Sequence, residues 1–307
     1  MKLLLYPLPG NEARAAVLAQ ALQGRCEVQV AGCVVHRFPD GETLVRVQPP
    51  TPGAQAVLLC SLDGADAKTV PLLMAAATLR ELGAARVGLV APYLAYMRQD
   101  RRFAPGQAVS ARLYAQLLSA HVDWLLTVDP HLHRIHDLAE IYTARTAVLH
   151  AAPRLAEWIR DHVERPLIVG PDGESAQWAA DVAARAGAPV VVVEKQRNGD
   201  LEVASSIPDL GVWPDRQPVL LDDIVSSGRT LVAVLEHLRA AGRPAAACVV
   251  VHGLFAGDAL DALRAAGAQR IACADTTAAV DGVERIALDE DLADALLELA
   301  RTAGDEP

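Results

Sequence analysis

The 307-residue sequence predicts an α/β protein of two tandem domains, each a mostly parallel sheet flanked by helices. Apolar runs typical of buried strands alternate with helical segments of ten or more residues, which favours parallel sheets covered on both faces. Two segments also recur about 160 residues apart: 57–94 matches 219–255 in outline, with Asp63 opposite Asp222, and 5–24 matches 168–187. We therefore expect two copies of one α/β unit, 1–149 and 150–307, with a boundary near 143–153.

Composition limits the function classes. With 52% hydrophobic residues the chain is expected to fold, and a formal charge of −10 disfavours a general binder of nucleic acid or anionic membranes. The five cysteines form no CxxC pair, which argues against a disulfide framework or a zinc cluster and fits buried thiols in a reducing cytoplasm. No apolar run approaches the roughly 18 residues of a membrane span. We expect a cytoplasmic protein with small-molecule partners, without nucleic acid and without a membrane.

The first half contains three polar segments next to predicted strands. HRFPDGETLVRV at 36–47 has a Pro-Asp-Gly turn before an alternating run, which predicts a hairpin. The segment 92–118 follows a strand and carries Arg98, Arg101 and Arg102; such clusters are commonly solvated surface, but beside a strand end in an acidic protein they favour a polyphosphate ligand. The segment 124–138 begins with a strand that ends in Asp129 and continues with three histidines, a pattern that suits a structural role as well as a metal.

Two segments of the second half end strands in charged residues. In LIVGPDGES at 167–175 a strand ends at Asp172, which could cap a helix or contact a ligand, and the two roles are compatible. VVVVEKQRNGD runs into Lys195 and Arg197 before an Asn-Gly-Asp turn. A charged hairpin edge would explain these residues, but Lys195 is one of three lysines among 28 basic residues, so it is not background composition.

The most informative stretch is PVLLDDIVSSGRT at 218–230. It predicts a buried strand, a tight loop and a helix that continues with apolar residues at helical spacing and stops at Gly242. The first amides of such a helix form a phosphate site, whereas the carboxylates of Asp222 and Asp223 suit sugar hydroxyls or a metal. Together they describe ribose 5-phosphate or its 1-pyrophosphorylated form. The counterpart near Asp63 lacks the second carboxylate and the Ser-Ser-Gly run, so we expect one catalytic site per chain.

LLDDIVSSGRT resembles the ribose-phosphate loop of type I phosphoribosyltransferases and phosphoribosyl pyrophosphate (PRPP) synthetases. RFPDGE at 37–42 and PYLAYMRQDRRFAPGQAVSA at 92–111 are similar to PRPP synthetase segments. The resemblance implies two phosphoribosyltransferase-type domains, an ATP-contacting one and a ribose-5-phosphate-binding one. It further implies transfer of the pyrophosphoryl group of ATP to the 1-hydroxyl of ribose 5-phosphate, giving PRPP and AMP.

The same resemblance assigns roles to individual residues and implies Mg²⁺ as the cofactor. Phe38, Asp40 and Glu42 are expected to bind the adenine of ATP in the site of a neighbouring subunit, which implies a homo-oligomer with shared sites. Arg98 and Gln99 are expected to make other contacts with ATP. His131 and Asp172 are expected to contact the metal, and Lys195 and Arg197 are expected to be catalytic. The residues expected to bind ribose 5-phosphate are Asp222, Asp223, Ser226, Ser227, Gly228 and Thr230.

Two other functions compete with this interpretation. A phosphoribosyltransferase would use the same ribose-phosphate loop but would not need Arg98, His131 or Lys195. A non-catalytic regulatory subunit would be favoured by loss of Lys195, Arg197 or His131, and the sequence retains all three. The chain also departs from the phosphate-activated class of PRPP synthetases, because His133, Ile141 and Thr143 stand where that class has polar allosteric contacts. We therefore expect weak or absent activation by phosphate.

Overall fold

The computed structural model describes residues 1–198, 202–206 and 212–302, with the backbone alone for 174, 194–198 and 202–206. The chain divides into two units, one of Met1–Leu149 together with the segment from Leu288 onward, and one of His150–Ala287. The junction at Leu149 and His150 lies inside the interval expected from the sequence. The end of the chain differs from that expectation, because helix α8 (Asp289–Thr302) belongs to the first unit and 150–307 do not form one domain.

The first unit is built on a six-stranded sheet in the order β2-β1-β5-β6-β7-β8, with every neighbouring pair parallel. Its strands are β1 (Lys2–Pro7), β2 (Glu27–Val30), β5 (Gln55–Leu59), β6 (Arg86–Ala91), β7 (Trp124–Val128) and β8 (Arg145–Leu149). Its other helices are α1 (Glu12–Ala21), α2 (Ala65–Glu81), α3 (Ser110–Ser119) and the 3₁₀ turn η1 (Leu138–Glu140). The hairpin predicted at 36–47 is confirmed: β3 (Cys33–Arg37) and β4 (Thr43–Val47) pair antiparallel, and β4 packs against α2.

The second unit has its own six-stranded parallel sheet, in the order β10-β9-β13-β14-β15-β16. Its strands are β9 (Pro166–Gly170), β10 (Val190–Val192), β13 (Gln217–Val225), β14 (Ala246–Gly253), β15 (Ala268–Ala274) and β16 (Glu284–Ile286), and an antiparallel pair is formed by β11 (Glu194–Asn198) and β12 (Glu202–Ser206). Its helices are α4 (Ala152–His162), η2 (Gly173–Ser175), α5 (Ala176–Ala186), α6 (Arg229–Ala240) and α7 (Ala259–Ala266).

Both units repeat one topology. When the sheet strands are numbered within each unit, both orders read 2-1-3-4-5-6, and in both an antiparallel pair is inserted between the second and third strands. The predicted duplication is therefore confirmed, with one correction of register. The equivalent strands β5 and β13 begin at Gln55 and Gln217, and counting from these residues places Asp222 opposite Cys60 rather than Asp63.

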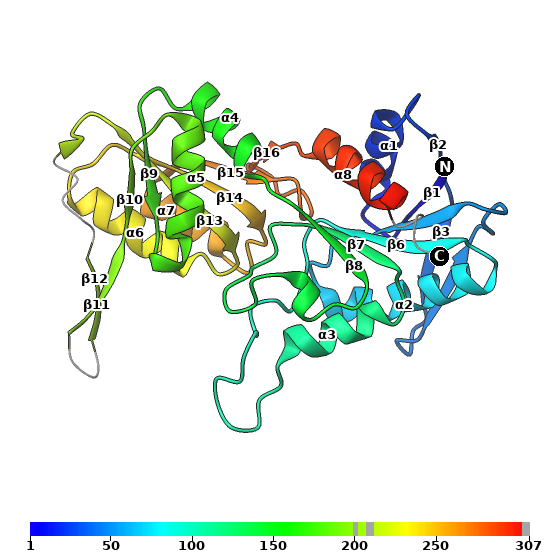
Figure 1. Cartoon of the computed structure of the whole chain (residues 1–307). Helices are drawn as coiled ribbons and strands as arrows, with labels where there is room; N and C mark the ends of the chain where they lie inside the picture. The colour runs from blue at the N-terminus through cyan, green and yellow to red at the C-terminus, as the bar shows by residue number, and fades with distance from the viewer. Residues whose placement is uncertain (199–201, 207–211, 303–307) are drawn as a thin grey trace. The chain divides into compact units, whose positions relative to one another are not determined.

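Helices cover both faces of each sheet, as Figure 1 shows for the first unit, where α1 and α8 lie on one face and α2 and α3 on the other. Because the crossovers from β1 and from β5 run in opposite directions along the sheet, right-handed connections place their helices on opposite faces. All five residues of β5 and all eight of β14 are consequently buried. Continuous apolar runs, rather than alternating ones, are what two covered faces require.

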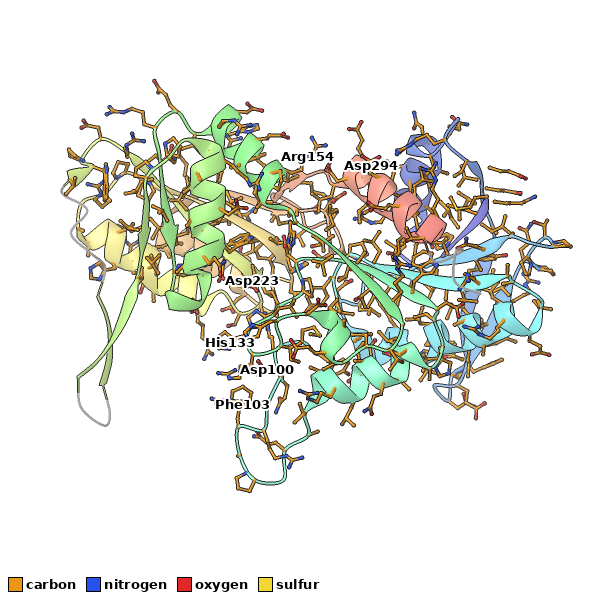
Figure 2. The ribbon with its side chains drawn as sticks, viewed as in Figure 1. Asp100, Phe103, His133, Arg154, Asp223 and Asp294 are labelled. Carbon is orange, nitrogen blue, oxygen red and sulfur yellow. The ribbon has the colours of Figure 1, made fainter. Side chains whose placement is uncertain are left out.

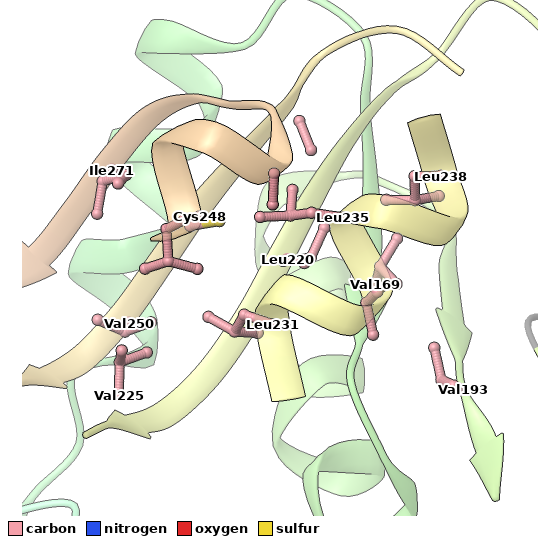
Figure 3. Close-up of a cluster of buried hydrophobic side chains, with 14 of the residues drawn as sticks. Val169, Val193, Leu220, Val225, Leu231, Leu235, Leu238, Cys248, Val250 and Ile271 are labelled. Carbon is pink, nitrogen blue, oxygen red and sulfur yellow. The ribbon is translucent and has the colours of Figure 1, made fainter. Parts of the chain in front are cut away.

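Helix α6 packs on the second sheet through the residues that the sequence spacing predicts. Figure 3 shows Leu231, Leu235 and Leu238 of this helix beside Leu220 of β13 and Cys248 of β14, in a cluster that also buries Val234. Because these four helical residues recur at spacings of three and four, they form one apolar face on the sheet. Gly242, with φ of +66°, follows the helix end where a left-handed residue is expected.

Long-range contacts explain why α8 joins the first unit. Buried Gln55 donates from Nε2 to the carbonyl oxygen of Ala300 at 3.0 Å, and Arg14 lies 3.4 Å from Asp289 in the acidic first turn of α8. Arg145 of β8 also donates to the carbonyl oxygen of Thr302 at 2.8 Å. Helix α8 thus packs beside α1 in the first unit as α4 packs beside α5 in the second.

Candidate active site

The ribose-phosphate loop expected from the sequence lies at the carboxyl end of β13. This strand runs to Val225, so Asp222 and Asp223 belong to the strand itself rather than to the loop after it. Ser226 is half-buried and Ser227 exposed, and Gly228, with φ of +69°, stands at the N-cap of α6. Among the described residues no side chain caps this helix, so its first-turn amides keep their capacity for an anionic ligand.

A second segment, Gly253–Ala256, supports this loop through backbone hydrogen bonds. The amides of Leu254 and Phe255 donate to the carbonyl oxygen of Val225 at 2.9 and 3.2 Å. The amide of Ala256 donates to the carbonyl oxygen of Ser226 at 2.9 Å. Phe255 has φ of +40°, a strained conformation for a bulky residue. This support is not predictable from the sequence, because hydrogen bonds between two loops leave no local pattern.

The carboxylates of the second unit influence one another strongly. Burial, followed by the negative charges of Asp223 and Asp172, raises the pKa of Asp222 well above its usual range. The Asp223 amide donates to Oδ1 of Asp222 at 3.0 Å, which only partly offsets this effect. A carboxyl group whose ionisation is disfavoured and that lies beside other carboxylates is suited to hydroxyl donors or a cation, so the arrangement is compatible with the ribose hydroxyls and the Mg²⁺ that the resemblance implies.

Within the second unit, the charge of Asp172 acts on Asp222 and contributes to its raised pKa. The pairing of Asp172 with His131 as metal contacts stays a prediction. Asp172 also organises its own turn, because its Oδ1 accepts from the Ser175 amide at 3.2 Å and its carbonyl oxygen accepts from the Ser175 hydroxyl at 2.7 Å. The described residues contain no group of three or more ligating side chains that could enclose a metal. Since Mg²⁺ commonly takes one or two carboxylates plus waters and substrate phosphates, the acidic set still fits it.

Lys195 and Arg197, the predicted catalytic residues, lie on β11, where their backbones pair with Ser205 and Val203 of β12. Their side chains lie outside the described part of the structure, so their roles stay predictions.

The predicted ATP contacts of the first unit follow β6. Arg98 is exposed and Gln99 half-buried, in a loop that Gln107 stabilises. Oε1 of Gln107 accepts from the amide of Ala104 at 3.0 Å and from Nε2 of Gln99 at 3.4 Å, and its carbonyl oxygen accepts from Nε of Arg102 at 2.7 Å. Gln107 was not singled out from the sequence, where a glutamine in a Pro-Gly turn gives no signal.

The half-buried His131 lies in the loop after β7. Because β6 and β7 are parallel neighbours, their carboxyl ends meet at one edge of the sheet, and the loops carrying Arg98, Gln99 and His131 begin there. Asp129, the first residue of the second loop, has φ of +29°, a strained conformation of the kind found at functional sites.

The predicted adenine contacts occupy the tip of the β3–β4 hairpin. The Phe38 amide donates to the carbonyl oxygen of Glu42 at 2.8 Å, and the Glu42 amide donates to Oδ1 of Asp40 at 3.1 Å. All three residues are exposed, and His36 packs edge-on against the Phe38 ring at 4.9 Å between centroids. An exposed turn stiffened in this way suits a contact with another molecule.

At the equivalent strand ends of the first unit, side chains of the unit form hydrogen bonds with the loops. Nζ of Lys68 donates to the carbonyl oxygen of Ser61 and to Asp63, both at 2.8 Å. Buried Asn11 accepts the Ser61 amide on Oδ1 at 3.1 Å and donates from Nδ2 to the carbonyl oxygen of Leu8 at 3.2 Å. The hydrogen bond between Asn11 and Ser61 bridges the loops after β1 and β5, while the start of α2 at Gly64, like that of α6 at Gly228, has no side-chain cap among the described residues.

The five cysteines are free thiols, and burial raises the pKa of Cys60 and Cys248 to about 12. They are not candidate nucleophiles. No helix in the described ranges combines the length and apolarity needed to cross a bilayer.

Comparisons with known proteins agree with the fold. Residues 10–121 match the model for the N-terminal domain of ribose phosphate pyrophosphokinase, and residues 139–259 match the phosphoribosyl transferase domain. A phosphoribosylpyrophosphate synthetase from Mycobacterium smegmatis superposes with a TM-score of 0.85 over 98% of this chain and 100% of that one, at 21% identity. The chain therefore has two phosphoribosyltransferase-type domains.

Sequence relatives define the family. The ribose-phosphate pyrophosphokinase of Methanopyrus kandleri is 33% identical over 84% of this chain and 88% of its own length. The ribose-phosphate pyrophosphokinase of Halobacterium salinarum is 34% identical over 88% of this chain and 93% of its own length. That of Bradyrhizobium diazoefficiens is 31% identical over 94% of this chain and 92% of its own length. This chain belongs to the ribose-phosphate pyrophosphokinase family.

Proposed function

We propose that the protein transfers the pyrophosphoryl group of ATP to the 1-hydroxyl of ribose 5-phosphate, producing PRPP and AMP. The observation that carries the proposal is the sequence of features along β13 and α6: Asp222 and Asp223, then the Ser226–Ser227–Gly228 loop, then a helix that no described side chain caps. Membership of the family and its N-terminal domain over 10–121 favour a synthetase over a phosphoribosyltransferase. The regulatory-subunit alternative has no observation in its favour.

Each unit supplies a distinct part of the chemistry. Ribose 5-phosphate is proposed to bind with its phosphate on Ser226, Ser227, Gly228 and Thr230 and its hydroxyls at Asp222 and Asp223. Arg98 and Gln99 are proposed to hold ATP, with His131 and Asp172 as metal contacts. Bound Mg²⁺ would neutralise charge on the polyphosphate. Because phosphoryl-type transfer depends on positioning and charge stabilisation, Lys195 and Arg197 are proposed to stabilise the charge that develops as AMP departs.

We also propose a homo-oligomer in which Phe38, Asp40 and Glu42 complete the adenine site of a neighbouring subunit. Apolar side chains are exposed on neighbouring elements of the first unit: Val34 and Leu44 on the hairpin, Val70 and Met74 on α2, and Leu113 and Leu117 on α3. Exposed apolar side chains on adjoining elements are typical of interaction surfaces. Native mass spectrometry is expected to show a dimer or larger assembly, and a monomer at working concentration would contradict the shared site. The cytoplasmic location also stays a prediction.

The proposed activity is tested by a product assay with purified protein, ATP, Mg²⁺ and ribose 5-phosphate, followed by chromatography. We expect AMP and PRPP in equal amounts, dependent on the sugar. ADP in place of AMP would identify a kinase that transfers one phosphoryl group. Absence of turnover, with PRPP binding retained, would shift the conclusion to a phosphoribosyltransferase or a regulatory subunit.

A further inference from the structure

An ion pair joins the two loops that carry the proposed ATP contacts of the first unit. Asp100, next to Gln99, accepts hydrogen bonds from both the backbone and the side chain of Arg134. The Arg134 amide lies 3.1 Å from Oδ2, and Nη1 lies 3.1 Å from Oδ1 and 3.3 Å from Oδ2. The loop after β6 is thereby bound to the loop after β7, three residues beyond His131.

The carboxylate of this pair is shielded from solvent. Its side chain is 4% exposed, whereas that of Arg134 is 38% exposed. Burial alone would raise the pKa of Asp100, but the hydrogen bonds and positive charge of Arg134 outweigh burial and lower it. A buried charge that loses its partner is strongly destabilising, so the two loops are held together as long as Asp100 is ionised.

An aromatic ring reinforces the connection. Phe103 is 54% exposed, yet the guanidinium carbon of Arg134 lies 5.9 Å and that of Arg101 5.0 Å from its ring centroid. Figure 2 shows Asp100 and Phe103 on one loop with His133 of the other loop beside them. Arg134 therefore contacts the first loop at two points, through its charge at Asp100 and through the π-face of Phe103.

Neutralisation of Asp100 also matters for the ligand. The segment 98–102 carries three arginines and this one carboxylate, which would repel a triphosphate if it were unpaired. The cross-loop pair directs that negative charge toward Arg134 and fixes the backbone beside Arg98 and Gln99. It therefore affects both the geometry and the electrostatics of the same segment.

We propose that Asp100 and Arg134 are positioning residues for ATP, which hold the Arg98–Gln99 segment and the His131 loop in the relative arrangement that the triphosphate requires. This inference rests on the proposed function, because it deepens the assignment of ATP to these loops. It predicts an effect confined to the nucleotide: loosening the pair should weaken ATP use and leave ribose 5-phosphate use unchanged.

The chain provides a matched control at the opposite end of the same two strands. Asp123, just before β7, accepts from Nη2 of Arg80 at 3.1 Å and from the Val87 amide of β6 at 2.7 Å. It thus has an arginine partner and a backbone partner, as Asp100 has, and it also connects β6 to β7. Because it lies at the amino ends of the strands, its loss should affect stability without affecting ATP.

The test compares Asp100→Asn, Arg134→Gln and Asp123→Asn with the wild type, with steady-state kinetics for each substrate and calorimetric titration with Mg-ATP. We expect the first two variants to raise both KM for ATP and Kd for Mg-ATP at least about tenfold, since small misplacements of binding groups are costly. KM for ribose 5-phosphate should stay within about twofold, and Asp123→Asn should alter neither constant by more than that. The double variant should be no worse than the more impaired single variant, because both changes break one contact.

Each alternative outcome has a distinct meaning. Equal increases in both KM values, additive effects in the double variant, or a mere loss of thermal stability like that of Asp123→Asn would show a structural role and overturn the proposal. If Asp100→Asn fails to fold, Arg134→Gln, which removes the more exposed partner, still decides the question. If the wild type is active and the Asp100 and Arg134 variants have unchanged constants for ATP, only the positioning role is refuted. If the wild type shows no activity and does not bind Mg-ATP, the proposed function is refuted as well.

Discussion

Replacing Asp222 by asparagine should stabilise the ligand-free protein while impairing its activity. Asparagine keeps the oxygen that accepts the Asp223 amide but removes a carboxylate that burial and the charges of Asp223 and Asp172 disfavour. Each unit of pKa shift corresponds to about 1.36 kcal/mol. Because the side chain is partly exposed, we discount the full shift and expect a gain of roughly 1–3 kcal/mol at pH 8.

The sign of the pH dependence follows from the direction of the shift. The pKa of Asp222 is raised in the folded state, so the stability of the protonated form is fully present below about pH 4 and is lost as the pH rises through the raised pKa. The amide introduced by Asp222→Asn does not titrate. The advantage of this variant over the wild type should therefore be small near pH 4–5 and largest above about pH 8, where it should reach roughly 2–10 °C in Tm.

Thermal unfolding from pH 5 to 8.5 measures this difference, with Asp261→Asn on α7 as the control because its side chain is 86% exposed. Mg²⁺ and ribose 5-phosphate should reduce the advantage, since they would favour the ionised wild-type carboxylate. A variant that is less stable than the wild type at pH 8, or a gain that does not change with pH, would refute the electrostatic reasoning.

Three further predictions concern turnover. Lys195→Ala should lower kcat by about a hundredfold or more with the fold retained by circular dichroism, the effect of losing one transition-state donor, and near-normal turnover would remove Lys195 from the mechanism. Gly253→Ala would place a Cβ 2.3 Å from Cε2 of Phe255 and displace the segment that supports the ribose-phosphate loop, so KM for ribose 5-phosphate should rise about tenfold. The control is Gly32→Ala, whose Cβ would have no atom within 4 Å and which should leave this KM unchanged. Equal KM values for the two variants would show that the loop does not depend on this support. Finally, inorganic phosphate should not raise the rate appreciably, and a strong activation would refute the interpretation of positions 133, 141 and 143.

The sequence predicted what depends on local pattern. The spacing of Leu231, Val234, Leu235 and Leu238 determined α6 and its buried face, and the Pro-Asp-Gly turn determined the β3–β4 hairpin. Features that depend on long-range contact were not predictable in this way. The attachment of α8 to the first unit rests on residues such as Gln55 and Ala300, which are 245 positions apart. The strained support at Phe255 and the pairing of Asp100 with Arg134 likewise follow from how separate loops meet.

The two units show how one topology can be specialised at different strand ends. In the second unit the candidate residues follow or end the first and third strands of the sheet, at Asp172 and at Asp222 to Thr230. In the first unit Asn11 and Lys68 form hydrogen bonds with Ser61 at those same positions, and the proposed ATP contacts follow the fourth and fifth strands instead. Since all carboxyl ends of a parallel sheet lie along one edge, a duplicated unit can move its ligand site along that edge by changing loops alone. In the proposed arrangement, the ion pair between Asp100 and Arg134 connects the two loops that carry the ATP contacts.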